Sequence, residues 1–161
     1  MKKKSRKPIV LVDIDGTLAD VRHRLHHITG KRKKNWKAFF EGMDRDKPNA
    51  STVAWVRTLA QVHDIVIITG RPEEYRTRTI EWLQENGVPF HDLFMRRNGD
   101  RRPDYEMKKD ALKHWPKKRI MLVIEDRPPV CDMWLQQGIR CVLVESDEAN
   151  QMVNEIYREK S

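Results

Sequence analysis

Two aspartates one residue apart follow a short apolar segment near the start of the chain. In "IVLVDIDGT" the apolar run leads directly into Asp13 and Asp15, and a Gly-Thr pair follows. Like charges at this spacing repel each other, and burial of either carboxylate is costly without a partner. A cation, an incoming phosphate or both would offset this cost. The pair therefore predicts metal or phosphate chemistry.

Two further groups of polar residues follow apolar segments of the same kind. Thr69, Gly70 and Arg71 end "DIVIITGR", and Glu125 and Asp126 end "RIMLVIED". If these segments are parallel strands, their carboxyl ends meet at the edge of the sheet where ligands bind. Several acids at one edge favour a hard divalent cation with oxygen ligands. Mg²⁺ fits, because it usually binds through one or two carboxylates and the phosphate of a substrate.

The elements that would position these groups alternate between strands and helices. A short apolar run rich in β-branched residues predicts a buried strand at residues 9–14, and further strands are predicted at residues 64–70, 90–96, 119–125 and 140–145. Helices are predicted at residues 36–40 and 128–138, and another begins at Pro72. Three more are predicted from their caps: one after Asn49 or Ser51, one from Asp104 to about Trp115, and one from Asp147 to about Glu159. This alternation predicts an α/β fold, a Rossmann-like doubly wound parallel sheet with helices on both faces.

Length and composition indicate a single globular domain. The chain has 161 residues, and 39% of them are hydrophobic, which suits one core. We expect residues 1–8 to be a basic disordered arm and residues 9–161 to be one domain. No apolar run approaches the roughly 18 residues of a membrane helix, so we expect a cytoplasmic protein that does not bind membranes. Cys131 and Cys141 lie outside any CxxC motif, and both are expected to be reduced.

Positive charge is concentrated in three places. The formal net charge is +8, and the N-terminal arm carries five of the basic residues. Residues 21–40 contain seven Lys or Arg, three His and no acid, and a third cluster comprises Arg96, Arg97, Arg101 and Arg102. Such patches attract polyanions, although charge runs are also common on solvated surfaces. His23, His26 and His27 have no Cys or spaced fourth ligand beside them, so we interpret them as basic surface rather than a zinc site.

The motifs together resemble the haloacid dehalogenase superfamily of phosphotransferases. "DIDGT", "TGR", a lysine at Lys108 and "ED" occur in this order, each after its predicted element. The segments "DGTLADVRHR", "ITGRPEEYR", "FMRRNGDRRPDYEMKKD" and "VIEDRPPVCDMW" are similar to the phosphatase domain of phage and bacterial polynucleotide kinase-phosphatases. That domain removes 3′-phosphates from nucleic acid ends. The sequence shows no glycine-rich P-loop and no Walker motif.

The resemblance implies roles for the acids and for the phosphate-binding groups. Asp13 would be the nucleophile that forms an aspartyl-phosphate, and Asp15 would protonate the leaving oxygen and then activate water. Asp13, Asp15 and Asp126 would bind Mg²⁺, and Glu125, which replaces an aspartate common in this subgroup, would act through a water. Thr69, Gly70 and Lys108 would bind the phosphate. Lys108 is preferred to Lys109 because it follows Asp104 by one helical turn.

The resemblance also implies a nucleic acid substrate. Arg24, Arg71, Arg96 and Asp104 would contact it, with Arg22 as a substitute for Arg24. Only residues 20–49 remain for a cap, and such a minimal cap leaves the site open to a macromolecular end. We therefore expect a Mg²⁺-dependent phosphomonoesterase of DNA or RNA 3′ ends, acting in end repair alone or beside a separate kinase or ligase. Two alternatives are a nucleoside monophosphate phosphatase and a non-catalytic nucleic-acid-binding module on the same fold.

Overall fold

A computed structural model describes residues 7–145, and the predicted helix from Asp147 and most of the N-terminal arm lie outside the described residues. In this part of the chain, five strands form a parallel sheet in the order β5-β4-β1-β6-β7. The strands are β1 (Ile9–Val12), β4 (Asp64–Pro72), β5 (Asp92–Arg96), β6 (Ile120–Glu125) and β7 (Cys141–Leu143). The order and the flanking helices confirm the predicted Rossmann-like α/β fold.

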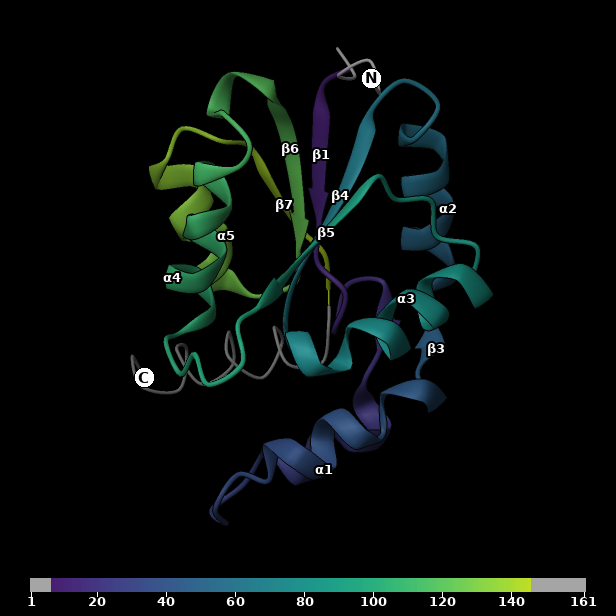
Figure 1. Ribbon diagram of the computed structural model, residues 1–161, viewed down its shortest axis with the longest axis vertical. Coiled ribbons are helices and arrows are strands. Elements are labelled where there is room, and N and C mark those ends of the chain that lie inside the picture. The colour runs from purple at the N-terminus through teal and green to yellow at the C-terminus, as the bar shows by residue number, and fades with distance from the viewer. Residues whose placement is uncertain (1–6, 146–161) are drawn as a thin grey trace, which may run out of the picture.

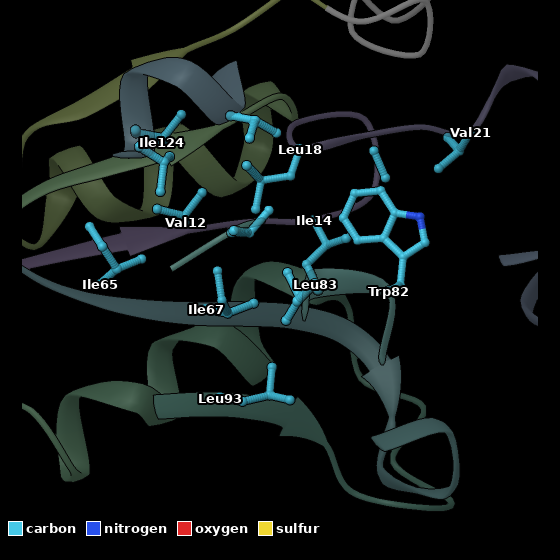
Figure 2. Close-up of a cluster of buried hydrophobic side chains, with 14 of the residues drawn as sticks. Val12, Ile14, Leu18, Val21, Ile65, Ile67, Trp82, Leu83, Leu93 and Ile124 are labelled. Carbon is cyan, nitrogen blue, oxygen red and sulfur yellow. The ribbon is translucent and has the colours of Figure 1, made fainter. Parts of the chain in front are cut away.

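Helices cover both faces of the sheet. One face carries α2 (Ala50–Leu59) and α3 (Arg76–Glu85), and the other carries α4 (Asp104–Lys109) and α5 (Pro128–Gln136) (Figure 1). Side chains alternate along a strand, so β1 contributes to two cores. Val10 and Val12 pack in the α2–α3 core, and Ile9 and Leu11 pack in the other. Figure 2 shows the first core, where residues of β1, β4 and β6 surround Trp82 and Leu83 of α3.

The central strand brings the two aspartates to a switch point in the sheet. Val12 pairs with Ile67 of β4 and with Ile124 of β6, so Asp13 leaves the sheet where β6 ends, while β4 continues to Pro72. From β1 the chain proceeds to β4 and β5 on one side, and it later adds β6 and β7 on the other. Such a reversal opens a ligand-binding crevice at the carboxyl ends of the strands.

A short insert lies beyond these carboxyl ends. Strands β2 (Ala19–Asp20) and β3 (Lys47–Pro48) pair in antiparallel fashion and enclose residues 21–46, which we call the cap insert. It contains the 3₁₀ helices η1 (Arg22–His27) and η2 (Met43–Arg45) and the helix α1 (Trp36–Glu41). Figure 1 shows α1 projecting from the body beyond the carboxyl ends of the strands. The small size of this insert agrees with the predicted minimal cap.

Several predicted boundaries were wrong. Pro72 does not begin a helix, because β4 extends to pair Pro72 with Arg96, and η3 (Glu73–Tyr75) precedes α3. Asp104 is the first residue of α4 rather than its cap. The helix ends at Lys109, and η4 (Asp110–Lys113) continues it.

The start of α2, one further 3₁₀ helix and the two cysteines are the remaining local features. Asn49 is the N-cap residue of α2, as predicted, but its side chain makes no capping hydrogen bond and instead donates to the carbonyl oxygen of Thr17 at 2.9 Å. The last 3₁₀ helix is η5 (Lys117–Arg119), and Cys131 and Cys141 form no disulfide. Among residues 7–145, no helix combines the length and the apolar character needed to cross a membrane.

Candidate active site

Asp13 lies at the end of β1 in an enclosed, polar environment. Its backbone N–H donates to Ile124 of β6 at 3.0 Å, and the residue is only 4% exposed. The Nζ of Lys108, on α4, donates to Asp13 Oδ1 at 2.8 Å and to Glu125 Oε2 at 2.7 Å. Lys109 is exposed, so the geometry selects Lys108 as the lysine that reaches the nucleophile candidate.

Three buried acids converge beside this lysine. Ligand atoms of Asp13, Glu125 and Asp126 all lie within 4.8 Å of one another. Burial, together with the charge of Glu125, raises the pKa of Asp13 to about 7 although Lys108 opposes the shift. Three carboxylates face one ammonium group, so the cluster carries excess negative charge. Oxygen donors with this charge fit a hard divalent cation such as Mg²⁺.

The turn after β1 depends on a glycine at position 16. Gly16 has a φ of +81°, and a Cβ there would lie 2.1 Å from Oδ2 of Asp126. Only glycine therefore allows this backbone conformation and this close approach together. The next residue also contacts the acids. The hydroxyl of Thr17 is a hydrogen-bond donor 3.2 Å from both Asp13 Oδ2 and Asp126 Oδ1.

Asp15 meets a different environment from Asp13. Nη2 of Arg71 donates to Asp15 Oδ1 at 2.6 Å, and Nη2 of Arg24 donates to the same oxygen at 2.8 Å. Although burial opposes the shift, Arg71 and Arg24 hold the pKa of Asp15 well below its ordinary value. The carboxylate of Asp15 does not join the acidic cluster. Metal binding and proton transfer by Asp15 both stay predictions.

The two arginines are buried rather than solvated. The side chain of Arg24 is 1% exposed and that of Arg71 is 0% exposed. Both also bind Asp46, at 2.6 Å for Arg24 Nη2 and 3.2 Å for Arg71 Nη2. Asp46 was not predicted from the sequence, because nothing in its short polar loop marks an acid that binds a residue 22 positions earlier. Two acids and two arginines thus alternate in one buried network.

The loop after β4 provides the candidate phosphate site. Thr69 is buried, and its Oγ1 accepts the N–H of Arg71 at 3.2 Å, which leaves the hydroxyl hydrogen for a phosphate. A Cβ at Gly70 would lie 2.8 Å from Oδ1 of Asp104, so this backbone passes close to α4. Phosphate binding by Thr69 and Gly70 stays a prediction.

Arg96 and Asp104 mainly support this loop. Arg96 donates to Asp104 Oδ1 and to the carbonyl oxygens of Gly70 (3.1 Å) and Arg102 (2.7 Å). Arg127 donates to Asp104 Oδ2 at 2.8 Å. The charge of Lys108, followed by those of Arg127 and Arg96, lowers the pKa of Asp104 against the effect of burial. Direct contact of Arg96 or Asp104 with substrate stays a prediction.

The three histidines of the cap insert do not converge on one point among the described residues. Nε2 of His23 lies 2.7 Å from Oδ1 of Asp46, whereas the rings of His26 and His27 contact each other at 4.0 Å. The interpretation of these histidines as basic surface stays a prediction.

Comparisons with known proteins find a matching family and solved structures that are similar to this chain. The family described as the polynucleotide kinase PNKP phosphatase domain matches residues 7–149. A chain in the structure of the Pnkp1/Rnl/Hen1 RNA repair complex has a TM-score of 0.70 and 24% identity, with 91% of this chain and 46% of that chain covered. The present chain thus spans about half the length of that protein.

Two hydrolases share the fold over nearly their whole length. A haloacid dehalogenase-like hydrolase from Streptococcus pneumoniae has a TM-score of 0.63 and 10% identity, with 89% of each chain covered. A haloacid dehalogenase family enzyme from Bacteroides thetaiotaomicron, in complex with magnesium and inorganic phosphate, has a TM-score of 0.55 and 12% identity, covering 88% of this chain and 96% of that chain. The family match extends over most of the sequence and the fold agrees with it. The chain therefore belongs to the family of polynucleotide kinase PNKP phosphatase domains, and it is a phosphatase with the haloacid dehalogenase fold.

Proposed function

We propose that this phosphatase removes 3′-phosphates from polynucleotide ends through an aspartyl-phosphate on Asp13, with Mg²⁺ as its metal. The observation that carries the chemistry is the contrast between the two aspartates. Asp13 lies with Lys108 in an acidic cluster that suits a cation, whereas two arginines hold Asp15 outside that cluster. This contrast supports a division of roles, with attack by Asp13 and proton transfer by Asp15.

The reaction proceeds in two displacements. A carboxylate oxygen of Asp13 attacks phosphorus, the bond from phosphorus to the sugar oxygen breaks, and Asp15 gives its proton to that oxygen. Asp15 then accepts a proton from water, whose oxygen attacks phosphorus and releases inorganic phosphate from Asp13. For the first step Asp15 must carry a proton. A phosphate that binds nearby favours this, since negative charge raises the pKa of a neighbouring carboxyl group.

Binding of the transferred phosphate is assigned to groups around Asp13. The ammonium of Lys108 offsets negative charge on the phosphate, and the Thr69 hydroxyl and the backbone at Gly70 add hydrogen-bond donors. Asp13 and Asp126 would hold Mg²⁺, with Glu125 beside them. When bound, Mg²⁺ would neutralise charge on the phosphate oxygens.

The substrate is inferred from the surroundings of the site. A cap insert of this size does not enclose a small substrate, and its exposed side carries a dense basic run that attracts polyanions. The solved chains of the Pnkp1/Rnl/Hen1 RNA repair complex favour RNA ends over DNA ends. We infer that the phosphatase works in end repair beside a separate kinase or ligase.

A substrate panel tests this proposal. The substrates are a 3′-phosphorylated oligonucleotide, its 5′-phosphorylated counterpart, nucleoside monophosphates and an aryl phosphate, each with Mg²⁺ or with EDTA. We expect the 3′-phosphorylated oligonucleotide to have the highest kcat/KM, EDTA to remove turnover, and Asp126→Ala to raise the Mg²⁺ requirement. Asp13→Asn should be inactive on every ester. A preference for nucleoside monophosphates would instead favour a nucleotidase, and turnover without metal would refute the metal assignment.

A further inference from the structure

The tip of the cap insert is exposed and carries only positive charge. Residues 29–37 are all exposed, and they include the basic residues Lys31, Arg32, Lys33, Lys34 and Lys37. The closest acids that follow in the sequence are engaged elsewhere, because Arg78 binds Glu41 at 3.0 Å and Asp44 at 2.6 Å. The positive charge of this segment is therefore not neutralised by its own helix.

Trp36 lies within this basic segment with 47% of its surface exposed. Its ring contacts two aromatic neighbours. Phe40 is nearly parallel to it at 6.0 Å and 23°, and Phe39 meets it edge-on at 5.8 Å. Asn35 caps α1 by accepting the N–H of Ala38 at 3.0 Å, so the start of the helix is fixed. The indole is thus a rigid aromatic surface that remains open to solvent.

A single exposed tryptophan is common on protein surfaces, and the cation beside this one makes it informative. Nζ of Lys34 lies over the Trp36 ring, 5.6 Å from its centroid. That distance is near the limit of about 6 Å for a cation–π contact, so the contact is weak. A flat ring could displace the Lys34 ammonium from the face of Trp36 and stack on the indole. The displaced ammonium would then lie beside that ring, where it could bind an anion.

We propose that Trp36 and residues 31–34 form a stacking platform for a single-stranded nucleic acid, with a base on the indole and its phosphates on the ammonium and guanidinium groups. Aromatic rings beside positive charge bind single strands in this way, because every base offers a flat face and every linkage a charge. A base within a duplex is already stacked and paired, so the platform favours single-stranded tails. The inference rests on the proposed function, since it describes how the same substrate is bound.

A chain of contacts joins the platform to the reacting groups. The ring of Phe39 lies 4.1 Å from the guanidinium carbon of Arg24, and that guanidinium binds Asp15. The platform and the group that positions the proton donor therefore belong to one rigid unit. A strand held on Trp36 would reach the site with its 3′ end.

The test compares tails with and without bases on intact protein. The substrates are a 3′-phosphorylated single-stranded oligonucleotide, the same chain with abasic sugars upstream of the last nucleoside, and a nucleoside 3′-monophosphate. We compare the wild type with Trp36→Leu, which keeps apolar volume against Phe39 and Phe40, and with Trp36→Phe, which keeps a ring. Trp36→Leu should raise KM for the normal oligonucleotide by about tenfold. Trp36→Phe should restore most of this loss, and KM for the abasic chain and for the mononucleotide should not change.

Three results separate the outcomes. If the wild type does not release phosphate from 3′-phosphorylated oligonucleotides, both the proposed function and the platform are wrong. If it does so but Trp36→Leu leaves KM unchanged, or raises KM equally for normal and abasic chains, only the platform is wrong. Replacing residues 31–34 with Ala should flatten the salt dependence of KM, whereas Trp36→Leu should leave that slope intact. If the salt dependence of KM is unchanged in the Ala variant, residues 31–34 do not contact the phosphates of the strand.

Discussion

Asp13 and Asp15 leave the same strand two residues apart, and their neighbours give them opposite properties. Burial and Glu125 raise the pKa of Asp13 to about 7, whereas Arg71 and Arg24 lower the pKa of Asp15 despite its burial. Nucleophilic attack by Asp13 needs a lower pKa and proton donation by Asp15 needs a higher one, shifts that a bound cation and a bound phosphate would respectively produce. The difference comes from residues brought by other elements, not from the aspartates themselves.

Asp15→Asn should impair poor leaving groups most. A sugar hydroxyl needs a proton as it leaves, and loss of a general acid costs roughly 100-fold or more in rate. An aryl oxide leaves without a proton, so its release in the first turnover should change far less. Single-turnover rates on a 3′-phosphorylated oligonucleotide and on an aryl phosphate give the comparison. Asp20→Asn, whose carboxylate binds Arg22 at the surface, is the matched control, and equal losses on both substrates would remove the acid role from Asp15.

Asp13→Asn should change how stability depends on pH in the presence of EDTA. The folded protein keeps the Asp13 proton up to about pH 7, whereas an ordinary aspartate has a pKa of 3.8. Between these values the unfolded chain binds fewer protons, so the free energy of unfolding falls as the pH rises. The variant should lack this part of the fall and should gain stability relative to the wild type as the pH approaches 7. Thermal unfolding across this range measures the difference, and parallel curves would show that Asp13 is not perturbed.

At the scale of the elements, the cap insert contributes to the site from outside the sheet. Arg24 of η1 and Asp46, which follows η2, complete the network around Asp15, and Trp82 of α3 donates to the carbonyl oxygen of Asp46 at 2.9 Å. The cap insert therefore contacts both Asp15 and the core. The position of the insert sets where Arg24 and Asp46 lie around Asp15.

Asp46→Asn should be strongly destabilising. It removes a buried partner of both arginines, and breaking a buried ion pair on one side typically costs about 3–5 kcal/mol. Asp44→Asn is the matched control two residues away, because Asp44 also binds an arginine but with its side chain 57% exposed. Exposed pairs contribute only about 0–1 kcal/mol. Urea unfolding of both variants measures the difference, and similar losses would show that the Asp46 network does not carry stability.

The elements differ in how far the sequence predicts them. The β-branched runs predict β1 and β4 well, because strands buried on both faces must be apolar throughout, whereas the edge strands β5 and β7 are only partly buried. Pro72 was predicted to begin a helix, but its pairing with Arg96 extends β4. Asp104 was predicted to cap a helix, because its arginine partners are distant in sequence and could not be predicted. Asp46 was missed for the same reason. Motif spacing identifies residues that act on a substrate, whereas residues that support them depend on tertiary contacts.

At the scale of the whole molecule, the site exists because three strand ends and the cap insert meet at one edge. β1 contributes Asp13 and Asp15, β4 contributes Thr69 to Arg71, and β6 contributes Glu125. Lys108 arrives from α4, on the face opposite to α2 and α3 (Figure 1). The parallel topology predicted from the alternation of strands and helices is what brings these groups together, so the site could be located before its contacts were known.

If Asp13 is the nucleophile, the protein forms an aspartyl-phosphate on Asp13 during turnover, and trapping this intermediate tests the mechanism directly. In Asp15→Asn with an aryl phosphate and Mg²⁺, the first displacement needs no proton but the second lacks its base. We predict a burst of aryl alcohol roughly stoichiometric with the protein, and mass spectrometry after acid quench should find phosphate on Asp13. Asp13→Asn should show neither. Steady release of aryl alcohol with no phosphate on the protein, or phosphate on a different residue, would contradict the account.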